Sequence, residues 1–146
     1  MDKFLAKSDI DLTILTGGLI AALTYFLGGW DDMLQALVMF AIIDYVTGVL
    51  AAFKEKKVSS STGMWGAVKK LIIFALVAVA HQLDGMTGAG TTYLRNGVLV
   101  FFIGNEGVSI LENAGRLGVP IPPFIISALE KLHGEKSKPP DVGAKG

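Results

Sequence analysis

The sequence predicts an all-α integral membrane protein with about four transmembrane helices and a short interfacial helix near the C-terminus. Hydrophobic residues make up 51% of the 146 residues, charged residues make up only 18%, and the mean hydropathy is +0.54. Soluble domains usually carry about 25% charged residues. Long uncharged runs recur along the chain, and their lengths match a hydrocarbon core about 30 Å thick. These observations indicate repeated membrane crossings.

The first span is predicted over residues 12–30, which contain no charge. As a helix this run rises about 28 Å, enough to cross a bilayer. Lys3 and Lys7 lie in the preceding segment, 1–11, so a secretory signal peptide is the alternative. The alternative is disfavoured because the run exceeds a usual signal core and ends at Trp30 without a small-x-small cleavage site.

The second span is predicted over residues 33–53, after a very short hairpin at Asp31 and Asp32. Asp44 is the charged residue near its middle, where a bare carboxylate costs at least about 2.5 kcal/mol. Such a group has to be protonated, paired with a base, or turned toward water. The candidate bases are Lys69, Lys70 and Arg95.

The third span is predicted over residues 64–83, after a serine-rich loop that ends at Gly63. Its uncharged part, 71–83, is too short to cross alone. The span therefore has to include Lys69 and Lys70, whose long stems can reach toward the interface.

The fourth span is predicted over residues 92–114, around the apolar centre 98–103. Because that centre is short, a re-entrant or interfacial helix is the alternative. Gly118 and the prolines that follow should end the helix. Residues 123–133 are predicted to form an amphipathic helix on the inner membrane surface, or alternatively a contact between subunits. The polar tail, 134–146, is expected to be disordered and cytoplasmic.

The orientation of the spans follows from the positive charges. Residues 54–70 contain five lysines and one glutamate, whereas the hairpin at Asp31 and Asp32 is acidic. Positively charged flanks are retained on the cytoplasmic side. With four crossings, both termini are therefore predicted to be cytoplasmic.

Composition excludes several classes of function. Thirteen basic and thirteen acidic residues give zero net charge, which offers no field to recruit nucleic acid. The absence of cysteine excludes disulfides and thiolate chemistry. Two histidines, His81 and His133, are too few for a zinc site. We expect no catalytic site, no metal and no cofactor.

Small and polar residues inside the spans are the candidate functional residues. Gly48 and Ala52 form a small-residue stripe below Asp44 that should meet another helix. Asp44, Gly48, Ala52, Lys69 and Lys70 are therefore the candidate residues for assembly and intramembrane polar contacts. The last span carries a polar side two turns long, whose candidate lumen-lining residues are Asn105, Glu106, Ser109, Glu112 and Asn113.

Four pieces of sequence together resemble a known family. They are Asp44-Tyr-Val-Thr-Gly-Val-Leu-Ala-Ala-Phe53 before a lysine-rich turn, Lys69-Lys70 before a run ending Ala80-His-Gln-Leu-Asp84, Asn105-Glu-Gly-x-Ser-Ile-x-Glu-Asn113, and Gly118-Val-Pro-Ile-Pro122. Their order and spacing resemble the toxin-secretion/phage-lysis holin family over roughly residues 33–133. The resemblance implies a protein that self-associates in the bacterial cytoplasmic membrane and opens it at a set time, so that a peptidoglycan hydrolase (endolysin) can act. Some relatives are linked to toxin release.

Two other classes of protein are the alternatives, a small transporter and an intramembrane enzyme. A small ion- or proton-coupled transporter would use Asp44 as its coupling carboxylate, but it would be expected to show an inverted repeat, and we find none. An intramembrane enzyme is disfavoured because the acidic residues and His81 show no nucleophile-base spacing on one helix. The expected partners are therefore membrane lipid, further copies of the chain and an endolysin.

Overall fold

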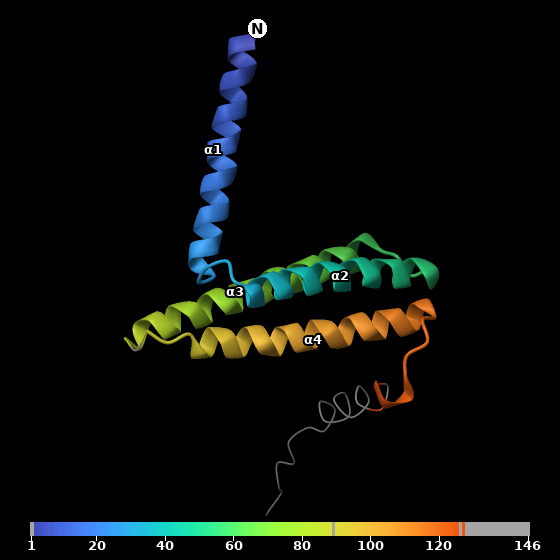
Figure 1. Ribbon diagram of the computed structural model, residues 1–146. Helices are drawn as coiled ribbons and strands as arrows, with labels where there is room; N and C mark the ends of the chain where they lie inside the picture. The colour runs from blue at the N-terminus through green and yellow to red at the C-terminus, as the bar shows by residue number, and fades with distance from the viewer. Residues whose placement is uncertain (1, 89, 126, 128–146) are drawn as a thin grey trace, which may run out of the picture.

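The computed structural model describes residues 2–88, 90–125 and 127, and four long helices account for most of them (Figure 1). These helices are α1 (Asp2–Phe26), α2 (Asp32–Lys54), α3 (Ser60–Met86) and α4 (Tyr93–Leu117). The described part of the chain contains no strand. The predicted all-α fold class is confirmed.

Three of the helices are long and apolar enough to cross a membrane. The candidate spans are Asp32–Lys54, Gly63–Met86 and Tyr93–Leu117. They overlap the predicted spans 33–53, 64–83 and 92–114. That residues 92–114 cross the membrane fully stays a prediction. In α1 the apolar stretch Leu12–Phe26 is shorter. The crossing by residues 12–30 therefore stays a prediction.

The three candidate spans form one bundle, and α1 stands apart from it. Figure 1 shows α2, α3 and α4 running along one another, with α1 projecting away from the end where α2 begins. Helix α4 packs against both α2 and α3, whereas α2 and α3 touch each other little. The side chains of residues 12–23 in α1 are all exposed. α4 is thus the central helix of the bundle.

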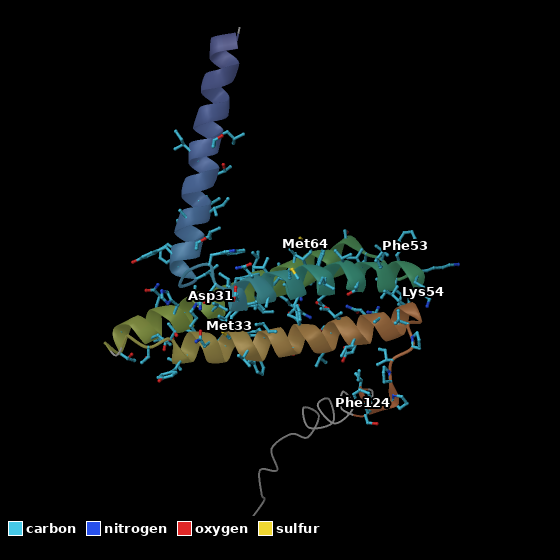
Figure 2. All side chains as sticks on the ribbon, viewed as in Figure 1. Asp31, Met33, Phe53, Lys54, Met64 and Phe124 are labelled. Carbon is cyan, nitrogen blue, oxygen red and sulfur yellow. The ribbon has the colours of Figure 1, made fainter. Side chains whose placement is uncertain are left out.

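The two ends of the bundle are named here by the residues that mark them in Figure 2: the Asp31 end, where α1 meets α2, and the Lys54 end, where α2 stops. The apolar core lies toward the Asp31 end. Its buried members are Leu34, Leu37, Ile73, Val77 and Leu99, with Phe102 and Ile103 among the residues packed around them. Toward the Lys54 end, polar side chains face one another between the helices.

The start of α3 differs from the sequence prediction. The serine-rich segment expected to be a loop up to Gly63 is helical from Ser60. The Gly63 N–H donates to the Ser59 carbonyl oxygen at 3.2 Å, so the helical hydrogen bonds begin within that segment. Serine is favoured at helix starts, and here it lies at the first turn rather than in a loop before it.

α1 stops at Phe26, four residues before Trp30, the last residue of the predicted first span. Gly28 and Gly29 have φ values of 86° and 101°, which are left-handed conformations that glycine adopts at little cost. They turn the chain away from the axis of α1. The helix also begins earlier than predicted, at Asp2, inside the segment expected to be an N-terminal flank.

The C-terminal end of α4 matches the predicted stop. Gly118 caps the helix with a φ of 90°, and the Val119 N–H donates to the Ala114 carbonyl oxygen at 3.0 Å. Residues 123–125 and 127 are helical, and Phe124 lies beyond the end of α4 in Figure 2. The rest of the predicted interfacial helix, 123–133, and the tail, 134–146, lie outside the described residues.

Candidate functional site

A cluster of three charged groups lies between the helices, near the middle of the bundle. Lys70 of α3 donates to Asp44 Oδ2 of α2 at 2.5 Å and also to Glu106 Oε2 of α4. The Glu106 side chain is 2% exposed, that of Asp44 15% and that of Lys70 17%. One ammonium group therefore connects all three helices of the bundle.

Asn113 extends this cluster toward the Lys54 end. Its Nδ2 atom lies 3.0 Å from Asp44 Oδ1 and 3.2 Å from both the Asp44 carbonyl oxygen and Thr47 Oγ1. Its side-chain oxygen accepts a hydrogen bond from Arg116 at 3.0 Å. A Cβ atom at Gly48 would meet this amide at 3.4 Å. The absence of a side chain at Gly48 thus lets α4 approach α2 closely.

A cavity of about 420 Å³ opens beside the cluster, toward the Lys54 end. Its walls come from all three helices of the bundle and from Val58 and Ser59 of the loop before α3. Its polar lining residues include Asp44, Lys69, Lys70, Asn105, Glu106, Ser109, Glu112, Asn113 and Arg116. A hollow with this lining suits water or ions better than an apolar ligand.

The structure brings the candidate residues from the sequence together around this cavity. Asp44 and Lys70 belong to the charged cluster, and Gly48, Ala52 and Lys69 line the cavity. All five candidate lumen-lining residues of α4 line it as well. Of the three candidate bases for Asp44, Lys70 makes the contact, whereas Lys69 is exposed and Arg95 pairs elsewhere. Lys70 therefore turns inward rather than toward the interface.

Sequence reasoning missed a second polar site, at the Asp31 end. The Arg95 guanidinium donates to Asp31 Oδ2 at 2.6 Å, to the Leu27 carbonyl oxygen at 2.6 Å and to the Gly29 carbonyl oxygen at 3.2 Å. Arg95 is 1% exposed. This side chain ties the linker between α1 and α2 to the start of α4, and a Cβ atom at Gly28 would lie 2.6 Å from its Nε atom.

Two carboxylates fix this Asp31 end further. Asp84 of α3 accepts hydrogen bonds from the backbone N–H groups of Leu94 and Arg95, at 3.0 and 2.9 Å, and so caps the first turn of α4. Asp31 caps α2 through the Leu34 N–H. The hydrogen bond from Arg95 lowers the pKa of Asp31 below its ordinary value of 3.8. The sequence signal was the Asp31-Asp32 pair directly before an apolar run.

A charged pair closes the opposite end of the bundle. Arg116 of α4 binds both oxygens of Glu55, through Nε at 2.9 Å and Nη2 at 3.1 Å. These hydrogen bonds lower the pKa of the Glu55 carboxyl. Lys54 donates to the Arg116 carbonyl oxygen at 3.1 Å. The end of α2 is thereby joined to the end of α4 at the surface.

Among the residues that the structure describes, no group of three histidine or acidic side chains is arranged to hold a metal ion. What the site offers is charge, hydrogen-bonding capacity and a cavity inside a bundle of membrane helices.

Comparison with known proteins assigns this bundle to a family. The sequence profile of the bacteriophage holin family matches residues 21–134. The chain belongs to this family. The match covers the linker after α1, all three candidate spans and the segment beyond them, so the holin region contains both the charged cluster and the Arg95 site.

Individual relatives agree with this assignment. A probable holin of Bacillus phage phi105 is 35% identical over 118 residues, which cover 77% of this chain and 83% of the relative. An uncharacterised 14.9 kDa protein of Clostridium perfringens is 42% identical over 113 residues, with coverage of 77% and 86%. The YqxH protein of Bacillus subtilis is 38% identical over 117 residues, with coverage of 80% and 82%. No solved structure matches the chain significantly.

Proposed function

We propose that this holin oligomerises in the bacterial cytoplasmic membrane and, at a set time, opens a lesion through which an endolysin is released or activated. Membership of the holin family supports a lytic, non-enzymatic role. The family match also favours this role over a transporter that uses Asp44.

The observation that carries the proposal is the cavity beside the cluster of Asp44, Lys70 and Glu106. Polar groups cannot face lipid cheaply, so they must contact one another or water. In this bundle they contact one another across the seam between the helices. The outward side chains, such as Ile42, Leu71 and Val100, are large and apolar, as lipid-facing residues should be.

The same groups permit a second arrangement in an assembly. If neighbouring subunits separate their helices along this seam, the cavity widens, and Asn105, Ser109 and Glu112 on its wall then line an aqueous path. In the closed seam and in the open path alike, the polar groups have hydrogen-bonding partners. The free energies of the two arrangements can therefore differ by only a few kcal/mol. A sharp, concentration-dependent opening is therefore physically reasonable.

Thiol labelling tests this opening directly, because the chain has no cysteine. Cysteine is placed singly at 105, 109 and 112, and cells are exposed to a charged, membrane-impermeant reagent before and after lysis is triggered. We expect labelling only after triggering. Val100→Cys, an exposed apolar position on the same helix, is the matched control and should remain unlabelled. Equal labelling before and after triggering would reject a hidden lumen.

We also propose four crossings with both termini in the cytoplasm, on the basis of the lysines in residues 54–70. For α1 to be the fourth crossing, it must swing about the linker at Gly28 and Gly29 until it lies alongside the bundle. A reporter fused after Gly146 should be active only in its cytoplasmic form. Cleavage of the 54–63 loop by protease added to intact protoplasts would contradict this orientation.

A further inference from the structure

The charged cluster in the middle of the bundle does not balance its own charge. Asp44 and Glu106 are two carboxyl groups, and both are held by the single ammonium of Lys70. If both carboxyl groups were ionised, the cluster would carry one negative charge between three membrane helices. An unbalanced charge is costly near the centre of a bilayer, where no water solvates it.

The surrounding groups do not supply the missing positive charge. Arg116 binds both oxygens of Glu55 through Nε and Nη2, so its charge is paired with that carboxylate, while its Nη1 donates to the neutral amide of Asn113. Lys69 lies on the cavity wall, but so does Glu112, of opposite charge. Outside the cluster, four ionisable side chains of the described residues line the cavity: Tyr45 of α2, Lys69 of α3, and Glu112 and Arg116 of α4.

One bound proton removes the imbalance. We propose that the cluster of Asp44, Lys70 and Glu106 is a binding site for a single exchangeable proton, reached from the Lys54 end through the cavity. The proton passes from water in the cavity to a carboxylate oxygen of the cluster, which becomes a neutral carboxylic acid. The other carboxylate and the Lys70 ammonium remain as an ion pair.

The hydrogen bonds assign the proton to Glu106. Both oxygens of Asp44 already accept hydrogen bonds, Oδ2 from Lys70 and Oδ1 from Asn113, so both are occupied by donors. Glu106 accepts from Lys70 through Oε2 and is the most buried member, at 2% exposure. Burial penalises the charged form of a carboxyl group, so the proton belongs on the more deeply buried of the two carboxyl groups, that of Glu106.

Access to the proton follows from the lining of the cavity. The cavity contacts both carboxyl groups and extends to Val58, Ser59 and Gly63, at the Lys54 end. At the other side of the cluster the space is filled by the apolar core around Leu37, Val77 and Leu99. Protons therefore exchange with one side of the bundle only.

Infrared spectroscopy of the purified, reconstituted chain counts this proton. A protonated carboxyl group has a C=O stretch separate from that of a carboxylate, and this band shifts when the sample is transferred to D₂O. We expect the wild type at neutral pH to show the band of one buried, exchangeable acid. Asp44→Asn and Glu106→Gln each leave one carboxyl group beside one ammonium, so each should abolish the band. Lys70→Met leaves two acids without a base and should double it.

The matched control is Glu55→Gln, which removes an ionised carboxylate outside the cluster and should leave the band unchanged. Because Asp44→Asn and Glu106→Gln preserve the size of the side chains, they test the proposal even if Lys70→Met fails to fold. Absence of the band in the wild type, or its persistence in either isosteric variant, overturns the proposal. This result would not affect the proposed lytic function, which the labelling experiment tests separately.

Discussion

The two halves of the bundle are built in different ways. Toward the Asp31 end, apolar side chains such as Leu34, Leu37 and Leu99 form the buried core, and Arg95 holds the linker from α1. Toward the Lys54 end, the helices enclose a cavity and are joined by polar contacts centred on Lys70 and Asn113. One half is packed with apolar side chains, and the other contains a cavity with a largely polar lining.

This difference has a consequence for how the bundle can separate. Apolar helices that part in a membrane are solvated by lipid, which leaves no aqueous path. Polar helices that part must be solvated by water. We therefore expect an aqueous path to begin in the half around Lys70 and Asn113, while the half around Leu37 stays packed.

Removing Lys70 should have the largest effect. Lys70→Met leaves Asp44 and Glu106 without their shared base, and breaking a buried ion pair in this way costs about 3–5 kcal/mol. We expect that decrease in the free energy of unfolding, measured in mixed detergent micelles. Lys69→Met, one residue away and exposed, is the control and should change stability by less than about 0.5 kcal/mol. Equal effects would show that Lys70 does not join the helices.

Removing the Arg95 guanidinium should have the next largest effect, but at the other end. Arg95→Leu deletes the hydrogen bonds to Asp31, Leu27 and Gly29. A hydrogen bond to a charged group is worth about 1.5–3 kcal/mol. Because the Asp31 side chain is 47% exposed and binds water once Arg95 is removed, we expect a net loss of about 2–3 kcal/mol rather than the sum over the three bonds. A spin label at Ile20→Cys should become more mobile, because α1 is no longer held. Unchanged mobility would mean that the linker is fixed without Arg95.

Removing the Asn113 amide should act on timing more than on stability. Asn113→Ala deletes the hydrogen bonds to Asp44 and Thr47, with an expected cost of about 1–2 kcal/mol. Lysis after induction together with an endolysin should begin earlier, since this contact holds the closed seam. A substitution of similar size in α1, Thr16→Ala, should leave the onset unchanged. An unaltered onset in Asn113→Ala would place Asn113 outside the opening step.

Protonation of Asp31 in acid should have the smallest effect on the free energy of unfolding. The pKa of Asp31 is lowered by Arg95 in the folded state, so its stabilising contribution is fully present above the ordinary value of 3.8 and is lost as the pH falls through the folded value. Because the Asp31 side chain is 47% exposed, the contribution is below about 1 kcal/mol. Unfolding measured from pH 5 to pH 2 should show this loss, and Asp31→Asn should lack it.

The three helices that could cross a membrane were predictable, because length and hydropathy are read from the local sequence. The limits of α2 agree to within one residue with the prediction 33–53. The sequence could not decide which lysine pairs with Asp44. Adjacent residues on a helix point in directions about 100° apart, so the two lysines cannot both face it. Only the rotation of α3 decides between Lys69 and Lys70.

Contacts between distant segments were the least predictable. Arg95 binds Asp31, 64 residues earlier in the chain, and no local pattern connects the two. The role of Asp84 in capping α4 was likewise missed, because a cap normally comes from the residue just before the helix. In contrast, the polar side of α4 was predicted from its helical spacing, since the residues involved lie on one element.

A pair of engineered disulfides tests the contrast between the two halves most directly. Gly48→Cys with Asn113→Cys would join α2 to α4 across the polar seam, where a Cβ at 48 lies 3.9 Å from the Cγ atom of Asn113. Leu37→Cys with Leu99→Cys would join the same helices within the apolar core. The account predicts that oxidation blocks lysis by the first variant, that a reductant restores it, and that the second variant lyses on the same schedule in both states. The account would be contradicted if the oxidised Gly48→Cys, Asn113→Cys variant still lysed cells. It would also be contradicted if oxidation blocked lysis only in the Leu37→Cys, Leu99→Cys variant.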